Sequence, residues 1–464
     1  MQVPQQSETV YHRLIVLSES STRFLALPAG ERFRLPSVLV SLHHRIAEQL
    51  TVFLQEQYSL DAACLFKLDI FSGPFKNPYY VVEARDTRRT SSPHFRWLSV
   101  SDFEEYQMEE PADCLAISNA VTRCKHAASS PNEAPFATPG WRDRLTNWIQ
   151  SRLLPLGMNL SGRFTQINAS PTFCLARFET DGPAVWFKAV GPPNLREYPV
   201  TMALSRYFPG YLPHVVAALQ EWNGWLATEA QGAHPTEAHG IDFWTRIAAA
   251  LAELQVSSFG QTLHLLDVGC LDARSCALGE LCDPFFAVMM ELAAQTSVQG
   301  AEQFSREDVL ELSTKVRTAL RLAADSEMPN TIDHLDFNPG NVIVGGSGCV
   351  FLDWAEGAIG HPFLTLQYLL VGFRRFHGHK AAWERSLVSA YIKPWQPFVC
   401  REAVRNAMRI SPLLAMFAHA ACGRAWRDPE LLERPEIASH LRKLLRRMKR
   451  ETDALEMQEV SCIS

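Results

Sequence analysis

The sequence lacks any hydrophobic run long enough to cross a membrane. Its first residues also lack the basic segment and apolar core of a signal peptide, so we expect a cytoplasmic protein with no membrane partner. No Cys-x-x-Cys pair occurs among the 11 cysteines. This absence argues against a zinc site or a disulfide framework and favours small buried thiols in a reducing compartment.

A large excess of one charge is also missing. The formal net charge is -6 over 464 residues, which argues against a surface built for nucleic acid or acidic lipid. Apolar residues make up 47% of the chain, enough for the cores of roughly two to four domains. Partners are therefore expected at a local site.

The most informative stretch covers residues 331–362. Two short apolar runs joined by a turn at Gly-Gly-Ser-Gly, residues 345–348, predict a β-hairpin. Asp336 and Asn341 precede the hairpin and Asp353 follows it. Mg²⁺ prefers a few hard oxygen ligands together with phosphate oxygens, and a reacting hydroxyl needs a carboxylate to take its proton. The stretch offers oxygen ligands for Mg²⁺ and a carboxylate that can take the proton of a hydroxyl.

The spacing of these residues resembles a known family. His-x-Asp-x-x-x-x-Asn, with an Asp twelve residues after the Asn and Trp354 next to it, is similar to the core of the aminoglycoside phosphotransferase and choline kinase-like branch of the protein-kinase-like fold. The resemblance implies Asp336 as the catalytic base, His334 as a brace of the loop, and Asn341 and Asp353 as magnesium ligands. Taken singly, an Asp or His in this stretch is more often a helix cap or a surface residue, and a chance arrangement in a turn-rich loop is the alternative.

Upstream, residues 164–190 predict three strands joined by turns. By the resemblance, Lys188 on the third strand pairs with nucleotide phosphates, and Glu197 in a helix over residues 196–208 holds that lysine in place. Alternatively, Lys188 is a solubilising charge on an edge strand, and Glu197 is an acid in the first turn of a helix, where the helix dipole favours it. The first turn has no glycine-rich phosphate loop, so main-chain amides and Ser170 would have to cover the phosphates.

Residues 222–232 predict a last strand that runs into a hinge. The resemblance implies that adenine is bound there through backbone groups, so the cofactor-binding residues Glu229 and Gln231 mark a region only. A helix over residues 241–257 opens a larger helical part, which by resemblance holds the acceptor. Four residues in that part could line an acceptor site or belong to the core: Trp395, Phe417, His419 and Trp426.

Residues 10–125 predict a mixed α/β unit with a helix over residues 39–58. The order of elements weakly resembles a Nudix hydrolase domain. In residues 52–59, where the metal-binding box would lie, only Glu56 remains, so we expect a module without hydrolase activity. An unrelated small α/β domain is the alternative.

A basic helix is predicted near the end of the chain. Residues 441–450 carry six basic side chains, and apolar side chains lie opposite. A solvated outer face is the ordinary explanation, with attachment to nucleic acid or a membrane as the alternative.

The sequence thus predicts an α+β protein with a bilobal protein-kinase-like fold. We expect a Nudix-like domain at residues 1–125, a linker at 126–140, a small β-rich N-lobe at 141–232 and a large helical C-lobe at 233–464. The resemblance implies ATP and Mg²⁺ as cofactors and a small-molecule hydroxyl as acceptor. A catalytically silent nucleotide sensor or scaffold is the alternative. The acceptor, the choice of ATP or GTP and the presence of a homodimer stay open.

Overall fold

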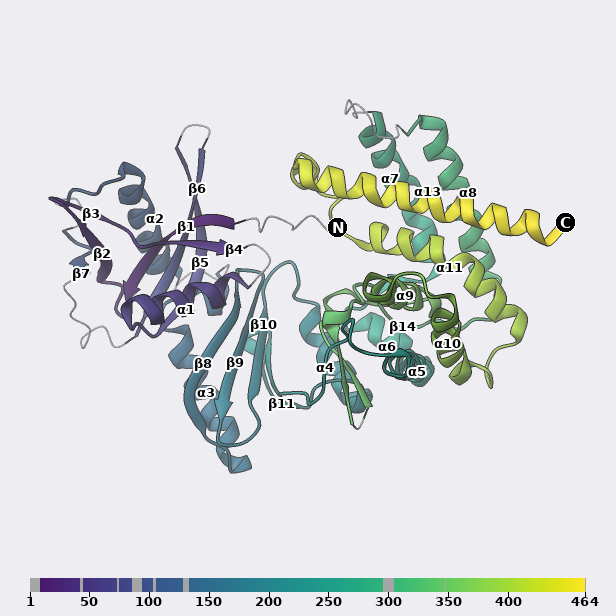
Figure 1. The fold of residues 1–464 in the computed structure, drawn as a ribbon, viewed down its shortest axis with the longest axis horizontal. Helices are drawn as coiled ribbons and strands as arrows, with labels where there is room; N and C mark the ends of the chain where they lie inside the picture. The colour runs from purple at the N-terminus through teal and green to yellow at the C-terminus, as the bar shows by residue number, and fades with distance from the viewer. Residues whose placement is uncertain are drawn as a thin grey trace. The chain divides into compact units, whose positions relative to one another are not determined.

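A computed structural model of the chain describes residues 9–41, 45–72, 75–85, 94–102, 106–127, 133–294, 304–346 and 348–463 (Figure 1). The α+β class expected from the sequence is confirmed. The chain divides into two compact units: Met1–Tyr198 with His214–Glu229, and Pro199–Pro213 with Ala230–Ser464. The boundaries predicted at residues 125 and 140 both fall inside the first unit.

The first unit contains a seven-stranded sheet in the order β3-β2-β1-β6-β5, with β4 paired to β1 and β7 to β2. Strands β1 and β6 run parallel, and the other neighbours run antiparallel. The strands are β1 (Thr9–Ser18), β2 (Arg23–Ala29), β3 (Arg32–Arg34), β4 (Ser37–Ser41), β5 (Ala62–Ser72), β6 (Phe75–Ala84) and β7 (Arg96–Ser99).

The central strand β1 is buried on both faces because successive side chains of a strand point to opposite sides. Leu14 belongs to the core that includes α1 (Ile46–Tyr58). Its neighbour Ile15 belongs to a second core, which includes α2 (Pro111–Ala127). The sheet is therefore a middle layer between two helices.

Helix α1 differs from the expected helix at its start. The prediction of a helix from residue 39 was wrong, because Leu39 lies in β4 and pairs with Tyr11 of β1. Glu56, the one carboxylate left in the predicted metal-binding box, is exposed on α1.

A second sheet of the first unit is antiparallel, in the order β11-β12-β10-β9-β8. Helix α3 (Trp141–Leu153) places Leu145 in a core shared with Phe187 of this sheet. Phe136 lies in the same core, so part of the segment expected as a linker is packed. The strands are β8 (Leu160–Ala169), β9 (Phe173–Thr180), β10 (Val185–Val190), β11 (Val215–Leu219) and β12 (Gly224–Thr228).

Two polar side chains tie the parts of the first unit together. Gln166 on β8 accepts a hydrogen bond from the Cys64 N–H (2.7 Å) and donates one to the Cys64 carbonyl (3.1 Å) on β5. Glu83 on β6 accepts the Gly140 N–H at 2.9 Å, at the start of α3. Burial raises the pKa of Glu83 to about 7. The Gln166 contact links elements on either side of the predicted linker, and the Glu83 contact reaches its last residue.

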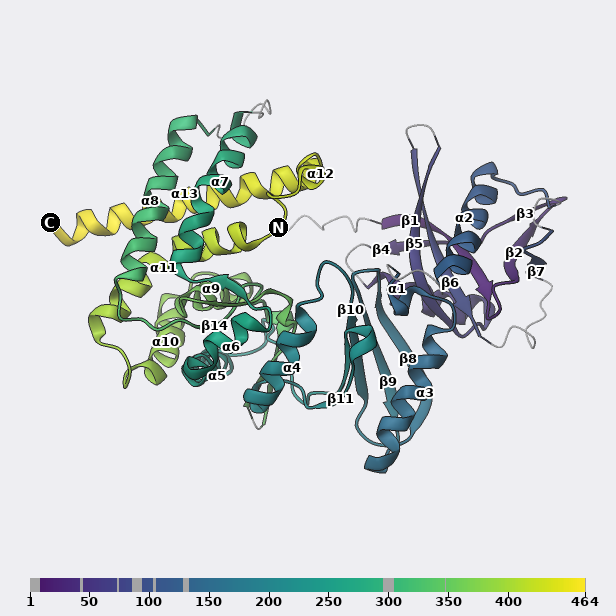
Figure 2. The same cartoon turned by 180° about the vertical axis from the view of Figure 1, so that it is seen from behind.

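The second unit is mostly helical, as Figure 2 shows from behind. Helix α4 (Glu197–Tyr207) contributes Val200 and Leu204 to its core. No helix within the described ranges is both long and apolar enough to span a membrane. The other helices are α5 (Ile241–Ser257), α6 (Thr262–Asp267), α7 (Ser275–Ala294), α8 (Arg306–Ala324), α9 (Phe363–His377), α10 (Ala381–Ile392), α11 (Arg401–Cys422), α12 (Pro429–Leu432) and α13 (Pro435–Ile463).

Two small sheets lie among these helices. One has three strands in the order β13-β17-β14, and the other is the hairpin β15-β16. The strands are β13 (Leu271–Ala273), β14 (Thr331–His334), β15 (Val342–Gly345), β16 (Gly348–Phe351) and β17 (Gly357–Gly360). The loop between β14 and β15 and the turn after β16 carry the residues singled out from the sequence.

Candidate active site

The hairpin expected after residue 341 is present. Val342 pairs with Phe351 and Gly345 with Gly348 across the two strands, while Ser347 of the predicted turn lies outside the described residues. The Leu352 N–H donates to the Asn341 carbonyl at 2.8 Å. The end of the hairpin is thereby held against the loop that precedes it.

The loop residue Asp336 is exposed, whereas its neighbours Leu335 and Phe337 are buried. Its backbone carbonyl accepts hydrogen bonds at 3.1 Å from the side-chain amides of Asn338 and Asn341. The amide nitrogen of Asn341 therefore faces Asp336, so its carbonyl oxygen is turned away and can bind a cation.

His334 connects the loop to the end of β16. The side chain is buried, and its Nε2 lies 2.8 Å from the Leu352 carbonyl oxygen. Because a carbonyl only accepts, Nε2 carries the proton. Burial lowers the pKa of His334, while the nearby carboxylates of Asp353 and Asp336 raise it. His334 thus connects the loop that carries Asp336 to the residue before Asp353.

Asp353 has a left-handed backbone conformation, with φ 63° and ψ 65°. This region is unfavourable for a residue with a side chain and persists where the surrounding structure imposes it. The next residue, Trp354, is buried and donates from its indole N–H to the Phe351 carbonyl at 3.2 Å. The packed tryptophan holds the turn while the Asp353 side chain stays exposed.

Buried polar side chains form a hydrogen-bonded network at β14, the strand that precedes the loop. The Thr365 hydroxyl accepts the His334 N–H at 3.0 Å and donates to Oδ1 of Asp333 at 2.6 Å. Gln255 donates to the same oxygen at 3.1 Å and accepts from the Tyr391 hydroxyl at 2.6 Å. Burial raises the pKa of Asp333 to about 8. Sequence reasoning missed Asp333, although a carboxylate in a buried strand beside the motif histidine was a usable signal.

Lys188 and Glu197 form an ion pair in the first unit. Nζ of Lys188 on β10 lies 2.5 Å from Oε1 of Glu197, the first residue of α4. The two side chains are 15% and 2% exposed. The ammonium group also lies 5.8 Å and 5.9 Å from the ring centroids of Phe173 and Trp225. The pair is therefore largely shielded from water.

The side chains of Ser170 and Glu229 have partners in their own sheet. The Ser170 hydroxyl lies 2.9 Å from that of Thr172 in the turn between β8 and β9. The Glu229 carboxylate accepts from Arg177 Nε at 2.7 Å and from the Trp186 indole at 2.9 Å. These contacts lower the pKa of Glu229. The Glu229 N–H also has a partner, because it donates to the Ala184 carbonyl at 2.9 Å.

Gln231 belongs to the second unit and is exposed. Its carbonyl oxygen lies so close to Gly345 that a Cβ built there would be 2.4 Å away. The Ala233 N–H also donates to the Val344 carbonyl at 3.1 Å. The hairpin and the expected hinge segment are therefore in backbone contact.

The structure brings the predicted residues together in two groups. His334, Asp336, Asn341 and Asp353 are joined by the loop and hairpin of the second unit, and Lys188 with Glu197 form a pair in the first. Of the four residues considered for an acceptor site, Trp395, Phe417 and Trp426 are core residues. His419 instead contacts the loop, with Nδ1 at 3.2 Å from the Leu335 carbonyl.

The donor set of the loop fits magnesium. Within the part of the chain that the structure describes, no three His, Cys, Asp or Glu side chains form a closed metal cage. Mg²⁺ does not require one, because it is held by one or two protein oxygens together with phosphates and water. Asn341 and Asp353 provide such a pair of oxygen donors.

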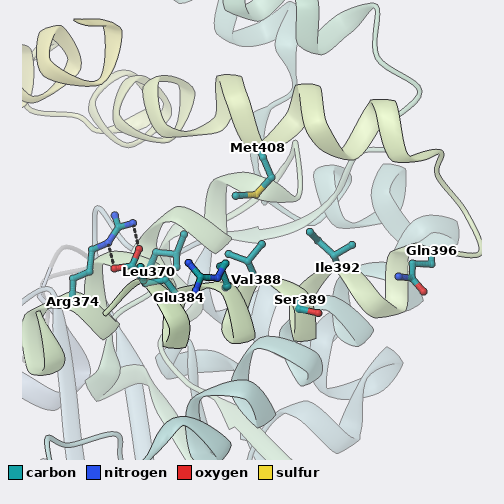
Figure 3. Close-up of a pocket in the computed structure, with 10 residues that line it drawn as sticks. Leu370, Arg374, Glu384, Val388, Ser389, Ile392, Gln396 and Met408 are labelled. Atoms are coloured by element: carbon teal, nitrogen blue, oxygen red, sulfur yellow. Dashed lines mark hydrogen bonds and ion pairs between the residues drawn. The ribbon is translucent and has the colours of Figure 1, made fainter. Parts of the chain in front are cut away.

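A separate hollow lies between α9, α10 and α11 (Figure 3). It measures about 550 Å³, and Leu370, Val388, Ile392 and Met408 line it with apolar surface. Arg374 and Glu384 close one side through a bidentate ion pair, drawn as dashed lines in Figure 3. None of its lining residues belongs to the loop at 331–362.

No protein-family model matches the sequence, and no curated protein matches it. Solved structures of small-molecule kinases match about two thirds of the chain. The choline kinase of Cryptosporidium parvum is 12% identical and has a TM-score of 0.47, with 68% of this chain and 97% of that chain covered. The macrolide 2'-phosphotransferase of Brachybacterium faecium is 14% identical and has a TM-score of 0.43, with 65% and 98% covered.

A spectinomycin phosphotransferase solved with ADP and spectinomycin is 11% identical, with a TM-score of 0.43 and coverage of 67% and 98%. Likenesses of this size do not establish a shared activity. The function proposed below depends on the contacts within this chain.

Proposed function

We propose that this protein is an ATP-dependent phosphotransferase of the protein-kinase-like type, which moves a γ-phosphoryl group to a hydroxyl of a small molecule. The observation that carries the proposal is the arrangement of Asp336, Asn341 and Asp353 around one loop. The Asn341 side-chain amide donates to the backbone carbonyl of Asp336, and His334 donates to the carbonyl of Leu352, the residue before Asp353.

Asn341 and Asp353 are assigned to magnesium. Asn341 has its carbonyl oxygen turned away from Asp336, and Asp353 holds an exposed carboxylate in a strained backbone conformation. Mg²⁺ bound there would neutralise phosphate oxygens and stabilise the negative charge of the leaving group. His334 and Trp354 keep these two donors in place from the buried side.

Asp336 is assigned as the base. Its exposed carboxylate takes the proton of the acceptor hydroxyl while the acceptor oxygen forms a bond to the γ-phosphorus. The bond from that phosphorus to the β–γ bridging oxygen breaks, and ADP leaves with the electron pair. Most of the rate enhancement in such reactions comes from positioning and charge stabilisation.

Lys188 is assigned to the nucleotide phosphates and Glu197 to holding that lysine. Their buried ion pair supports this role, because a shielded ammonium group in a fixed position is suited to bind phosphate oxygens. Ser170 and the backbone of Glu229 and Gln231 are proposed to flank the nucleotide.

The test is phosphoryl transfer from ATP to a panel of small alcohols in the presence of Mg²⁺. We expect Asp336→Asn to lower kcat by about 10²- to 10⁴-fold and to leave ATP binding nearly unchanged. Asp325→Asn, the same change at an exposed acid that ends α8, is the matched control. ATP binding without transfer to any alcohol, or equal kcat values for the two variants, would contradict the proposal.

A further inference from the structure

The C-terminal helix α13 presents two different flanks. Its buried stripe contains Leu441, Leu445 and Met448. On one side of the stripe, Lys449 pairs with Asp308 of α8 at 2.7 Å. Helix α13 also packs along α11, as Figure 1 shows. The flank away from Lys449 therefore faces another part of the second unit.

That other flank carries His440, Lys443 and Arg447. Residues three, four or seven apart lie on one side of a helix, so these three side chains share a face. The rings of His440 and of His419 on α11 lie 6.4 Å apart at an interplanar angle of 72°. We call these four residues the basic face.

The basic face lies beside the proposed base. His419 Nδ1 is 3.2 Å from the carbonyl oxygen of Leu335, the residue before Asp336. Since that carbonyl only accepts, Nδ1 carries a proton and Nε2 is turned away from the loop. His419 also lies 6.2 Å from the ring of Tyr368. Burial raises the pKa of Tyr368 well above its ordinary value, and nearby Arg447 lowers it. Arg447 lies on the same face of α13 as His440, whose ring lies beside that of His419.

The charges of the basic face are not used in ion pairs. Within the described residues, neither Lys443 nor Arg447 contacts a carboxylate, although Arg447 is only partly exposed. Lys449 on the other flank does have such a partner. Among the described residues, Glu451 lies one turn after Arg447 on α13, and the backbone carbonyl of Glu356 accepts the Leu335 N–H at 3.2 Å. Neither neutralises Arg447 by direct contact.

We propose that the acceptor carries an anionic group, a carboxylate or a phosphate, that binds the basic face while its hydroxyl meets Asp336. This inference rests on the proposed function. An arginine binds either anion through paired, charge-assisted hydrogen bonds, and a partly buried guanidinium does so with little competition from water. The ring N–H of His440 adds a donor beside it, and Lys443 adds positive charge.

The first experiment compares acceptors that differ in one group. With Mg²⁺ and ATP, we expect glycerol 3-phosphate to exceed glycerol in kcat/KM, or glycolate to exceed glycolamide, and ethanolamine to be the poorest acceptor. Which anionic compound is preferred distinguishes phosphate from carboxylate. Preference for glycerol, glycolamide or ethanolamine, with transfer still dependent on Asp336, would reject the anionic acceptor and leave the proposed function intact.

The second experiment locates the anion. Arg447→Met should raise KM for the preferred anionic acceptor by about tenfold or more and change kcat by less than about twofold. Arg442→Met makes the same change on the Lys449 side of α13 and should leave KM unaltered. Equal KM values for the two variants would overturn the inference.

The third measurement is independent of turnover. With ADP and Mg²⁺ present, glycerol 3-phosphate or glycolate should raise the Tm of the wild-type protein and of Arg442→Met, but not of Arg447→Met. A rise in this pattern without any phosphoryl transfer would support the anion site and contradict the proposed function. No rise with either anion in the wild-type protein would reject the anion site.

Discussion

Lys188 and Glu197 form an ion pair with a distance of 2.5 Å between Nζ and Oε1, and only 2% of the glutamate side chain is exposed. The pair joins the third strand of the antiparallel sheet to the first residue of α4. Removing one member of a buried pair is costlier than removing both, because the remaining charge loses its partner without regaining water.

Lys188→Met should therefore lower the free energy of unfolding by about 3 kcal/mol. The double variant Lys188→Met/Glu197→Gln should recover part of this loss, since no uncompensated charge remains. Phosphoryl transfer should be lost in both, because neither has the cation proposed to bind phosphate. Urea unfolding followed by tryptophan fluorescence gives the stabilities. If the double variant is as unstable as Lys188→Met, the unpaired charge of Glu197 is not the cause of the lower free energy of unfolding.

The glycine pair in the hairpin turn offers a matched comparison. A Cβ at Gly345 would lie 2.4 Å from the Gln231 carbonyl oxygen, whereas a Cβ at Gly346 would meet nothing within 4 Å. Gly345→Ala should destabilise the protein by about 1–3 kcal/mol, because the hinge backbone must move. Gly346→Ala should be nearly neutral. Thermal unfolding of both variants is the measurement, and equal Tm values would contradict the close contact at Gly345.

Two substitutions of Asp353 distinguish its effect on the free energy of unfolding from its effect on catalysis. At φ 63°, glycine is unstrained and a β-branched residue is strongly disfavoured. Asp353→Gly should leave the free energy of unfolding within about 1 kcal/mol of the wild type and abolish magnesium-dependent transfer. Asp353→Val should lower both. Chemical unfolding together with a Mg²⁺ titration of activity distinguishes them. A fully active Asp353→Gly would remove this residue from the proposed metal site.

Two buried carboxyl groups predict how stability depends on pH. Burial raises the pKa of Glu83 to about 7 and that of Asp333 to about 8, above their ordinary values of 4.5 and 3.8. The folded protein therefore binds protons more tightly than the unfolded chain, so stability is greatest at low pH for these groups and is lost as pH rises toward 7 and 8. The Glu83 shift corresponds to about 3 kcal/mol.

Burial lowers the pKa of His361 to about 4, which makes stability rise with pH up to about 6.5, so the effect of Glu83 is measured as a difference between variants. From pH 5 to pH 7, the Tm of Glu83→Gln relative to that of the wild type should increase with pH. The amide keeps an oxygen for the Gly140 N–H but cannot ionise. Glu133→Gln, at an acid paired with Arg123, is the control and should retain the wild-type dependence of Tm on pH. The same dependence of Tm on pH in Glu83→Gln and in the wild type would contradict the assignment.

The local features of the site could be predicted from the sequence. The hairpin at 342–351 follows from two apolar runs and a glycine turn, and the order of His334, Asp336, Asn341 and Asp353 was visible as a spacing. Lys188 and Glu197 are nine residues apart, so a strand followed by a helix suffices to suggest their contact. In each case the interacting residues are close in sequence, or their backbone pattern has a fixed period.

Contacts between distant residues could not be predicted in this way. Asp333 meets Gln255 across 78 positions, and His419 meets Leu335 across 84. Phe136 lay in a stretch that looked like a linker, yet it is core, because Pro, Ser and Ala content says nothing about an aromatic side chain that finds a tertiary partner.

The sequence by itself determined the order of the chemical groups and the loop and hairpin that carry them, since hydrogen bonding between nearby residues sets those elements. Only the tertiary structure decided that a buried carboxyl group lies next to the loop and that His419 contacts the residue before Asp336. It also decided that, among the described residues, Lys443 and Arg447 on one flank of α13 have no carboxylate partner. These arrangements depend on how helices pack, and many packings are compatible with the same local periodicity.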